Sequence, residues 1–140
     1  MSQVIWVGKI FEGKIDESGD QFDKPFILKF SKKIDKICKE NKLVEISKFF
    51  DSTELQAEMT DDYQGFEDGY RLVESKGKWF EPSEGIDVIQ KLINILKETP
   101  IKFGILSDRY NEIQNELNNC LEQLKDIENK NGKFHFCIVP

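Results

Sequence analysis

The two ends of the chain carry strand-like segments, and this feature constrains the fold more than any other. Residues 4–11 are apolar at successive rather than alternate positions, which is typical of a strand covered on both faces. Residues 134–139 follow Asn131-Gly132, a strong turn signal, and predict a final strand. The two terminal strands can be neighbours in one small sheet, against which the intervening helices pack.

Helical periodicity dominates the middle of the chain. Pro25 suits the first turn of a helix over residues 25–41, in which apolar side chains occupy one arc and lysines the opposite arc. A more apolar helix is predicted over residues 82–98, with Pro82 at its start and Pro100 beyond its end. We therefore expect at least two helices to cover the sheet.

A third long helix is predicted after Asp108, whose side chain can cap it. It carries a narrow apolar seam made of Tyr110, Ile113, Leu117, Cys120, Leu124 and Ile127. The seam can pack on the domain's own sheet, or it can pair with its copy in a second subunit of an oligomeric adaptor. The first alternative is favoured, and the fold class expected is one α+β domain over residues 1–140 with about three main helices.

The remaining segments give weaker signals. Residues 43–50 predict a short apolar element, and residues 51–69 predict a loop with a short helix. Residues 70–74 and 78–80 flank Ser75-Lys76-Gly77, which predicts a hairpin. Residues 101–106 read as a short strand.

Composition restricts the partners. A chain of 140 residues has the length of one ordinary domain. Its net charge of −6 and isoelectric point of about 4.9 disfavour nucleic acid as a partner and favour a basic partner.

No apolar run approaches the roughly 18 residues of a membrane span, so no membrane partner is expected. The start of the chain has no signal peptide, and the three cysteines form no CxxC pair, so we expect a cytoplasmic protein with reduced thiols.

Catalytic, metal and cofactor motifs are not evident, and we expect no enzyme and no cofactor. His135 and Cys137 share one face of the predicted strand, which makes a Cys–His dyad conceivable, although two packed side chains are the simpler interpretation. Asp16, Ser18 and Asp20 mimic the opening of a calcium loop, but the glycine and glutamate that must follow are absent. Because carboxylates can meet in space, a small-ligand protein or enzyme with a carboxylate-lined pocket is the alternative function.

Charge is distributed unevenly along the chain. Lysines concentrate in residues 25–48, and acidic residues concentrate directly after them. The acidic stretch either folds over the lysine face or meets a basic partner, and aromatic side chains within it can anchor such a contact. The predicted partner-binding residues are Asp51, Glu54, Glu58, Asp61, Asp62, Tyr63, Phe66, Glu67 and Asp68.

The string Gly77-Lys78-Trp79-Phe80-Glu81-Pro82-Ser83-Glu84-Gly85 precedes an apolar helix, a long helix and the closing strand. In this C-terminal half the chain resembles small bacterial toxin-immunity proteins of contact-dependent growth inhibition and polymorphic toxin systems. The resemblance implies a non-enzymatic inhibitor that binds and neutralises a cognate toxin domain as a monomer in a 1:1 complex. Many such toxins are basic nucleases, which an acidic inhibitor can cover. Trp79 is expected to plug the core or, alternatively, to be an exposed recognition residue.

Overall fold

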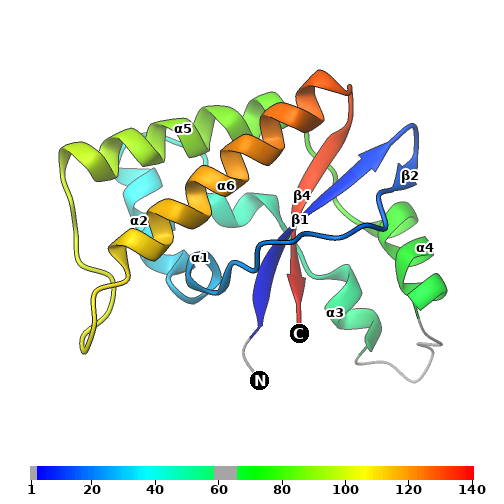
Figure 1. Cartoon of the computed structure of the whole chain (residues 1–140), viewed down its shortest axis with the longest axis horizontal. Helices are drawn as coiled ribbons and strands as arrows, with labels where there is room; N and C mark the ends of the chain where they lie inside the picture. Colours follow the sequence, from blue (N-terminus) through cyan, green and yellow to red (C-terminus); the bar gives the residue numbers. More distant parts are fainter. Residues whose placement is uncertain (1–2, 59–65) are drawn as a thin grey trace.

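A small mixed sheet forms the centre of the molecule (Figure 1). The computed structural model describes the backbone of residues 3–58 and 66–140 and the side chains of residues 3–57 and 70–140. The strand order in this part is β2-β1-β4-β3. The strands are β1 (Val4–Phe11), β2 (Lys14–Ile15), β3 (Phe50–Asp51) and β4 (Lys133–Val139). The terminal strands β1 and β4 pair antiparallel along their length, while β3 runs parallel to β4. The predicted α+β class and the pairing of the terminal strands are confirmed.

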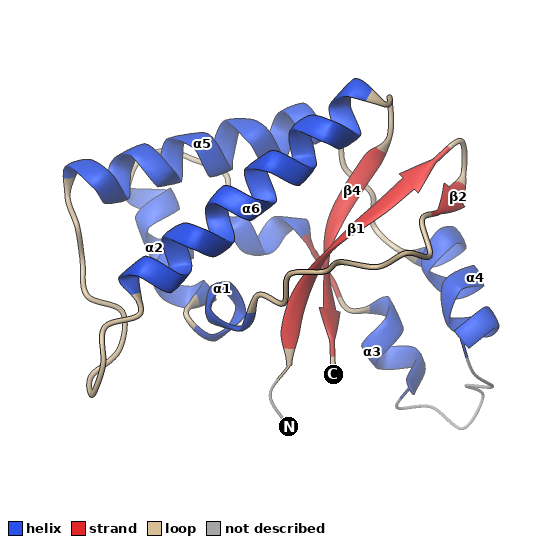
Figure 2. Cartoon of the chain, viewed as in Figure 1, coloured by secondary structure: helices blue, strands red, loops and turns tan. Residues whose placement is uncertain are grey.

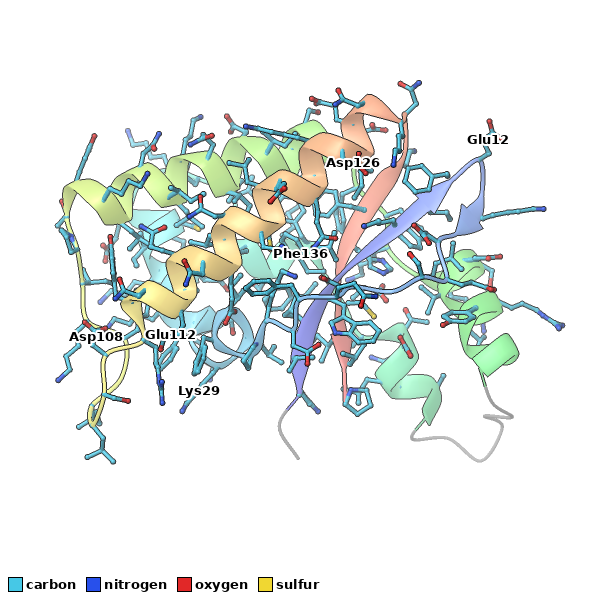
Figure 3. All side chains as sticks on the ribbon, viewed as in Figure 1. Glu12, Lys29, Asp108, Glu112, Asp126 and Phe136 are labelled. Carbon is cyan, nitrogen blue, oxygen red and sulfur yellow. The ribbon has the colours of Figure 1, made fainter. Side chains whose placement is uncertain are left out.

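Four helices cover one face of the sheet (Figure 2). They are α1 (Pro25–Lys29), α2 (Ser31–Glu40), α5 (Pro82–Glu98) and α6 (Tyr110–Asn129), and the short 3-10 helix η1 (Ile46–Phe49) connects α2 to β3. Sheet side chains such as Val7, Phe134 and Phe136 enter the core between the sheet and these helices, and Figure 3 labels Phe136 there. The seam of α6 is buried in this core, so it packs within its own domain.

Two short helices lie on the other side of the sheet. These are α3 (Thr53–Glu58) and α4 (Phe66–Lys76), which Figure 2 shows away from α5 and α6. Helix α3 contacts β4 and α4 contacts β2. This second face is therefore only partly covered. Within the described residues no helix is both long and apolar enough to cross a membrane.

The string around Trp79 joins α5 to the sheet. Phe80 forms an antiparallel bridge with Phe134 of β4, with backbone hydrogen bonds of 2.8 and 3.0 Å. A Cβ atom on Gly85, in the first turns of α5, would lie 2.5 Å from Phe134 Cζ. Any other residue at this position would keep α5 farther from β4, because its Cβ atom would collide with Phe134.

The helices predicted over residues 82–98 and from residue 110 are confirmed. The helix predicted over residues 25–41 is divided in two at Phe30. Of its apolar arc, Ile27, Ile34 and Cys38 are buried, and Phe26, Phe30 and Ile37 are partly buried against the core. All three cysteines are buried, and none forms a disulfide.

The predicted hairpin at residues 70–80 is wrong, because residues 66–76 form helix α4. The amide of Gly77 donates to the Val73 carbonyl, so Gly77 closes the end of the helix rather than a strand turn. Val73 is buried and Tyr70 is partly buried, three residues apart. Two apolar residues at this spacing fit one face of a helix as well as they fit a strand.

The predicted strand at residues 101–106 is also wrong, because residues 99–109 form a loop between α5 and α6. Only Phe103 of this segment is buried, and Gly104 has a φ of +108°. The Asp108 carboxylate accepts hydrogen bonds from the amides of Phe103 and Tyr110. These local hydrogen bonds take the place of the backbone hydrogen bonds to a neighbouring strand that a β-strand would need.

Candidate functional site

A pocket of about 210 Å³ opens on the less covered face of the sheet. Its floor comes from the middle of β1 and β4, and its sides come from α3, α4 and the segment after β2. Trp6, Tyr70, Val73 and Val139 supply much of the apolar lining. The acidic side chains at the pocket are Asp16, Glu17, Asp20 and Glu54.

The floor follows from strand alternation and register. Gly8 lies opposite His135 and Trp6 lies opposite Cys137, so the four residues occupy one face of the sheet. The predicted common face of His135 and Cys137 is therefore confirmed. A Cβ atom on Gly8 would lie 2.5 Å from His135 Nε2, so glycine gives the imidazole room to lie against β1.

His135 is held as a neutral imidazole with a defined proton position. Its side chain is 1% exposed and stacks on Trp79, with ring centroids 3.9 Å apart and planes 16° apart. Nδ1 lies 2.7 Å from the Lys78 carbonyl oxygen, and because a carbonyl only accepts, Nδ1 carries the proton. Burial lowers the pKa of His135, so Nε2 is left as an acceptor. Nε2 is buried and has no hydrogen-bond partner among the described residues.

Trp79 follows neither predicted alternative. It is partly buried and lies outside the hydrophobic core, and its ring stacks on the imidazole of His135.

The geometry does not assemble the conceivable Cys–His dyad. His135 Nδ1 is bound to the Lys78 carbonyl, and Nε2 has no partner in the described part of the chain, so neither nitrogen is bound to the Cys137 thiol. Cys137 Sγ instead lies 3.5 Å from Glu54 Oε2. The other two thiols lie away from the pocket, and burial raises the pKa of Cys38 to about 11 and that of Cys120 to about 12.

Asp20 is a structural member of the pocket wall. Its carboxylate accepts hydrogen bonds from the amides of Val7 and Phe22 at 2.8 Å and from Lys24 Nζ at 2.5 Å. Lys24 is fully buried, and its backbone pairs with Ile5 of β1. The ion pair and these hydrogen bonds fix residues 20–24 against the sheet, and Lys24 neutralises the Asp20 charge. The pair was not predicted from the sequence, because a lysine four residues after an aspartate is common on surfaces.

Three further carboxylates lie at the pocket, those of Asp16, Glu17 and Glu54. Asp16 accepts hydrogen bonds from the amide and hydroxyl of Ser18, and these bonds lower its pKa. Glu17 is exposed and Glu54 is partly buried. Lys9 is the one cationic side chain that lines this pocket in the described part of the chain. No group of three or more His, Cys, Asp or Glu side chains suited to a metal occurs within residues 3–57 and 70–140.

The predicted partner-binding residues are only partly placed by the structure. Asp51 is 4% exposed and its carboxylate accepts hydrogen bonds from the amides of Thr53 and Lys78, so it organises the fold and offers little surface to a partner. Glu54 lies at the pocket. The side chains of the other predicted residues lie outside the described part, namely Glu58, Asp61, Asp62, Tyr63, Phe66, Glu67 and Asp68.

Sequence reasoning missed the contribution of residues 6–20 to this site. Asp16 and Glu17 meet Glu54 only because β1 and β4 pair and place α3 beside the first loop. The polar residues that follow Gly13 were the feature of the sequence that could have indicated this contribution to the pocket. No protein-family model, curated protein or solved structure matches the chain.

Proposed function

We propose that the chain is a non-enzymatic immunity protein that binds and neutralises a cognate toxin domain in a 1:1 complex in the cytoplasm. The observation that carries the proposal is the acidic pocket on the partly covered face of the sheet. Three carboxylates, those of Asp16, Glu17 and Glu54, surround an opening with apolar sides, and Lys9 is the cationic side chain that lines it in the described part of the chain. A basic toxin surface, such as that of a nuclease, complements this arrangement.

The size and lining of the pocket suit one long basic side chain. The apolar stem of a lysine or arginine can lie along Trp6 and Val73 while its charged end meets the carboxylates. The indole of Trp6 adds an aromatic face that attracts a cation. Arginine inserted in this way is a common anchor of protein interfaces.

Two features support inhibition by binding rather than catalysis. The imidazole and thiol at the pocket are not joined as base and nucleophile. The remaining thiols are fully buried and hold their protons at neutral pH. A protein that acts by covering its target needs a rigid, complementary surface and no reactive group.

The test begins with the gene next to the one that encodes this chain. We expect it to encode a toxin with a separable C-terminal domain. Co-expression should abolish the toxicity of that domain, and the two proteins should co-purify at equal stoichiometry. Continued toxicity, together with separate elution of the two proteins, would refute the proposal.

A second candidate is a small-ligand protein that holds an amine in the same pocket. The buried acceptor His135 Nε2 at the floor favours it, because an acceptor without a partner is costly unless a donor satisfies it. Titration with agmatine and spermidine, followed by NMR of the imidazole, tests this function. Saturable shifts of the His135 resonances without any toxin binding would favour the amine, and unchanged resonances would exclude it.

A further inference from the structure

The loop at residues 99–109 carries two apolar side chains at its tip. Ile105 is 91% exposed and Leu106 is 101% exposed. Figure 1 shows the loop protruding at one end of the molecule, and α3 and α4 lie at the other end. Adjacent aliphatic residues with this exposure contribute nothing to the core and are available for an external contact.

The loop is held in shape by its own bonds. Lys102 Nζ donates to the Ile105 carbonyl at 3.2 Å, and Lys33 Nζ donates to the Lys102 carbonyl. Phe103 is buried against the edge of Phe30, with ring centroids 5.7 Å apart. The tip is therefore presented by a fixed scaffold, and little ordering is needed when it makes a contact.

Cationic side chains surround the base of the loop. The exposed cations on α1, α2 and the loop are Lys29, Lys32, Lys33, Lys36, Lys102 and Arg109. Figure 3 labels Lys29 beside Asp108 and Glu112 at the base of the loop. Asp108 accepts hydrogen bonds from two backbone amides, and the ion pairs Arg109–Glu112 at 3.1 Å and Lys36–Glu40 at 3.9 Å engage one cation each. Lys29, Lys32, Lys33 and Lys102 have no carboxylate partner in the described part of the chain, so this end presents a group of unpaired lysines.

We propose that this end of the molecule docks on an anionic phospholipid surface, with Ile105 and Leu106 in the headgroup–acyl boundary and the lysines on lipid phosphates. An aliphatic tip with a group of lysines behind it is the combination that such a surface attracts. No spanning helix is needed for this contact. The proposal is independent of toxin binding, since it uses the end of the molecule away from the acidic pocket.

A lipid surface fits these residues better than a protein partner does. Lysine is depleted and leucine is under-represented among the residues that carry protein interfaces, where tyrosine, tryptophan and arginine dominate. The carbonyls of Lys102 and Ile105 already accept hydrogen bonds from lysine amines. Backbone groups satisfied in this way lower the cost of placing the loop beside apolar lipid.

Vesicle co-sedimentation tests the proposal with the whole chain. The probes are phosphatidylcholine vesicles with and without roughly a third phosphatidylglycerol. We expect binding to the anionic vesicles, little binding to the neutral vesicles, and loss of binding at high salt. Ile105→Ser with Leu106→Ser should weaken binding at least about tenfold, while Val44→Ser, at a partly exposed apolar residue elsewhere, should leave it unchanged.

A variant that removes lysine charges separates the electrostatic part of the contact from the apolar part. Lys29→Gln, Lys32→Gln and Lys36→Gln together should remove the preference for anionic vesicles, and none of these lysines donates to the loop in any hydrogen bond described above. Circular dichroism checks that every variant is folded. Failure of the natural chain to bind anionic vesicles, or equal binding by the serine variant, would overturn the proposal. A protein partner that depends on the tip, in the absence of vesicle binding, would overturn it as well.

Discussion

Three buried ionisable side chains hold the fold together at the scale of single residues. Lys24 and Asp20 form a fully buried ion pair beside β1. Glu116 of α6 is 3% exposed, and its carboxylate accepts hydrogen bonds from the amides of Phe26 and Ile27 at the start of α1. Asp20 also binds the amide of Val7 in β1, and Glu116 joins α6 to α1. None of the three was identified from the sequence, because charged residues are mostly exposed.

Lys24→Met should lower the free energy of unfolding by about 3 kcal/mol or more, because it leaves the Asp20 carboxylate buried and uncompensated. Lys91→Met is the matched control, since Lys91 pairs with Asp87 on the surface and should contribute less than about 1 kcal/mol. Urea denaturation measures both. Equal losses in the two variants would show that the buried pair has no special role.

The pH dependence of stability should report on Glu116. Burial raises its pKa from 4.5 to about 7 in the folded chain, so the folded state binds this proton more tightly than the unfolded state. Its contribution is complete below pH 4.5 and is lost as the pH rises to about 7. The lowered pKa of His135 acts in the opposite direction, because its contribution is lost as the pH falls below 6.5.

A comparison with Glu116→Gln isolates the glutamate from the histidine. Between pH 4.5 and pH 8, the free energy of unfolding of the natural chain should fall by up to about 3 kcal/mol relative to that of the variant, because glutamine does not titrate. Urea midpoints at intermediate pH values measure the difference. A stability gap between the two proteins that stays constant over this range would contradict the assignment.

At the scale of elements, the long periodic segments were predicted well and the short ones were not. Residues 82–98 and the seam of α6 have enough turns for one apolar stripe to identify a helix. Residues 70–80 and 101–106 hold only a few apolar positions each. Residues 70–76 form part of a helix that places Tyr70 and Val73 at the pocket, and local hydrogen bonds of Asp108 hold residues 103–109 in a loop.

Gly85→Ala tests how closely α5 approaches β4. An added methyl group would meet Phe134 at 2.5 Å and Leu124 at 3.0 Å, so we expect a loss of about 1–3 kcal/mol despite the better helix propensity of alanine. Ser83→Ala, at an exposed position of the same first turn, should change stability by less than about 0.5 kcal/mol. Thermal unfolding compares them, and an unchanged or increased stability of Gly85→Ala would show that the helix can move away freely.

At the scale of the whole molecule, charge is separated between two ends. The pocket end carries Asp16, Glu17 and Glu54, and the other end carries the lysines of α1, α2 and the protruding loop. The sequence indicated both charge groups, but it placed the acidic surface within residues 51–68. Pairing of β1 with β4 adds Asp16 and Glu17 to that surface, and no local pattern reveals a contact between strands at opposite ends of a chain.

The affinity of the cognate toxin domain for charge-reversal variants is the most direct test of the central claim. Isothermal titration should give a dissociation constant at least about tenfold higher for Glu17→Lys with Glu54→Lys than for the natural chain. Glu122→Lys with Glu128→Lys, which makes the same net charge change on the exposed side of α6, should bind with almost unchanged affinity. Equal affinities of the natural chain and the Glu17–Glu54 variant, with the variant folded, would contradict the claim that the acidic pocket binds the toxin.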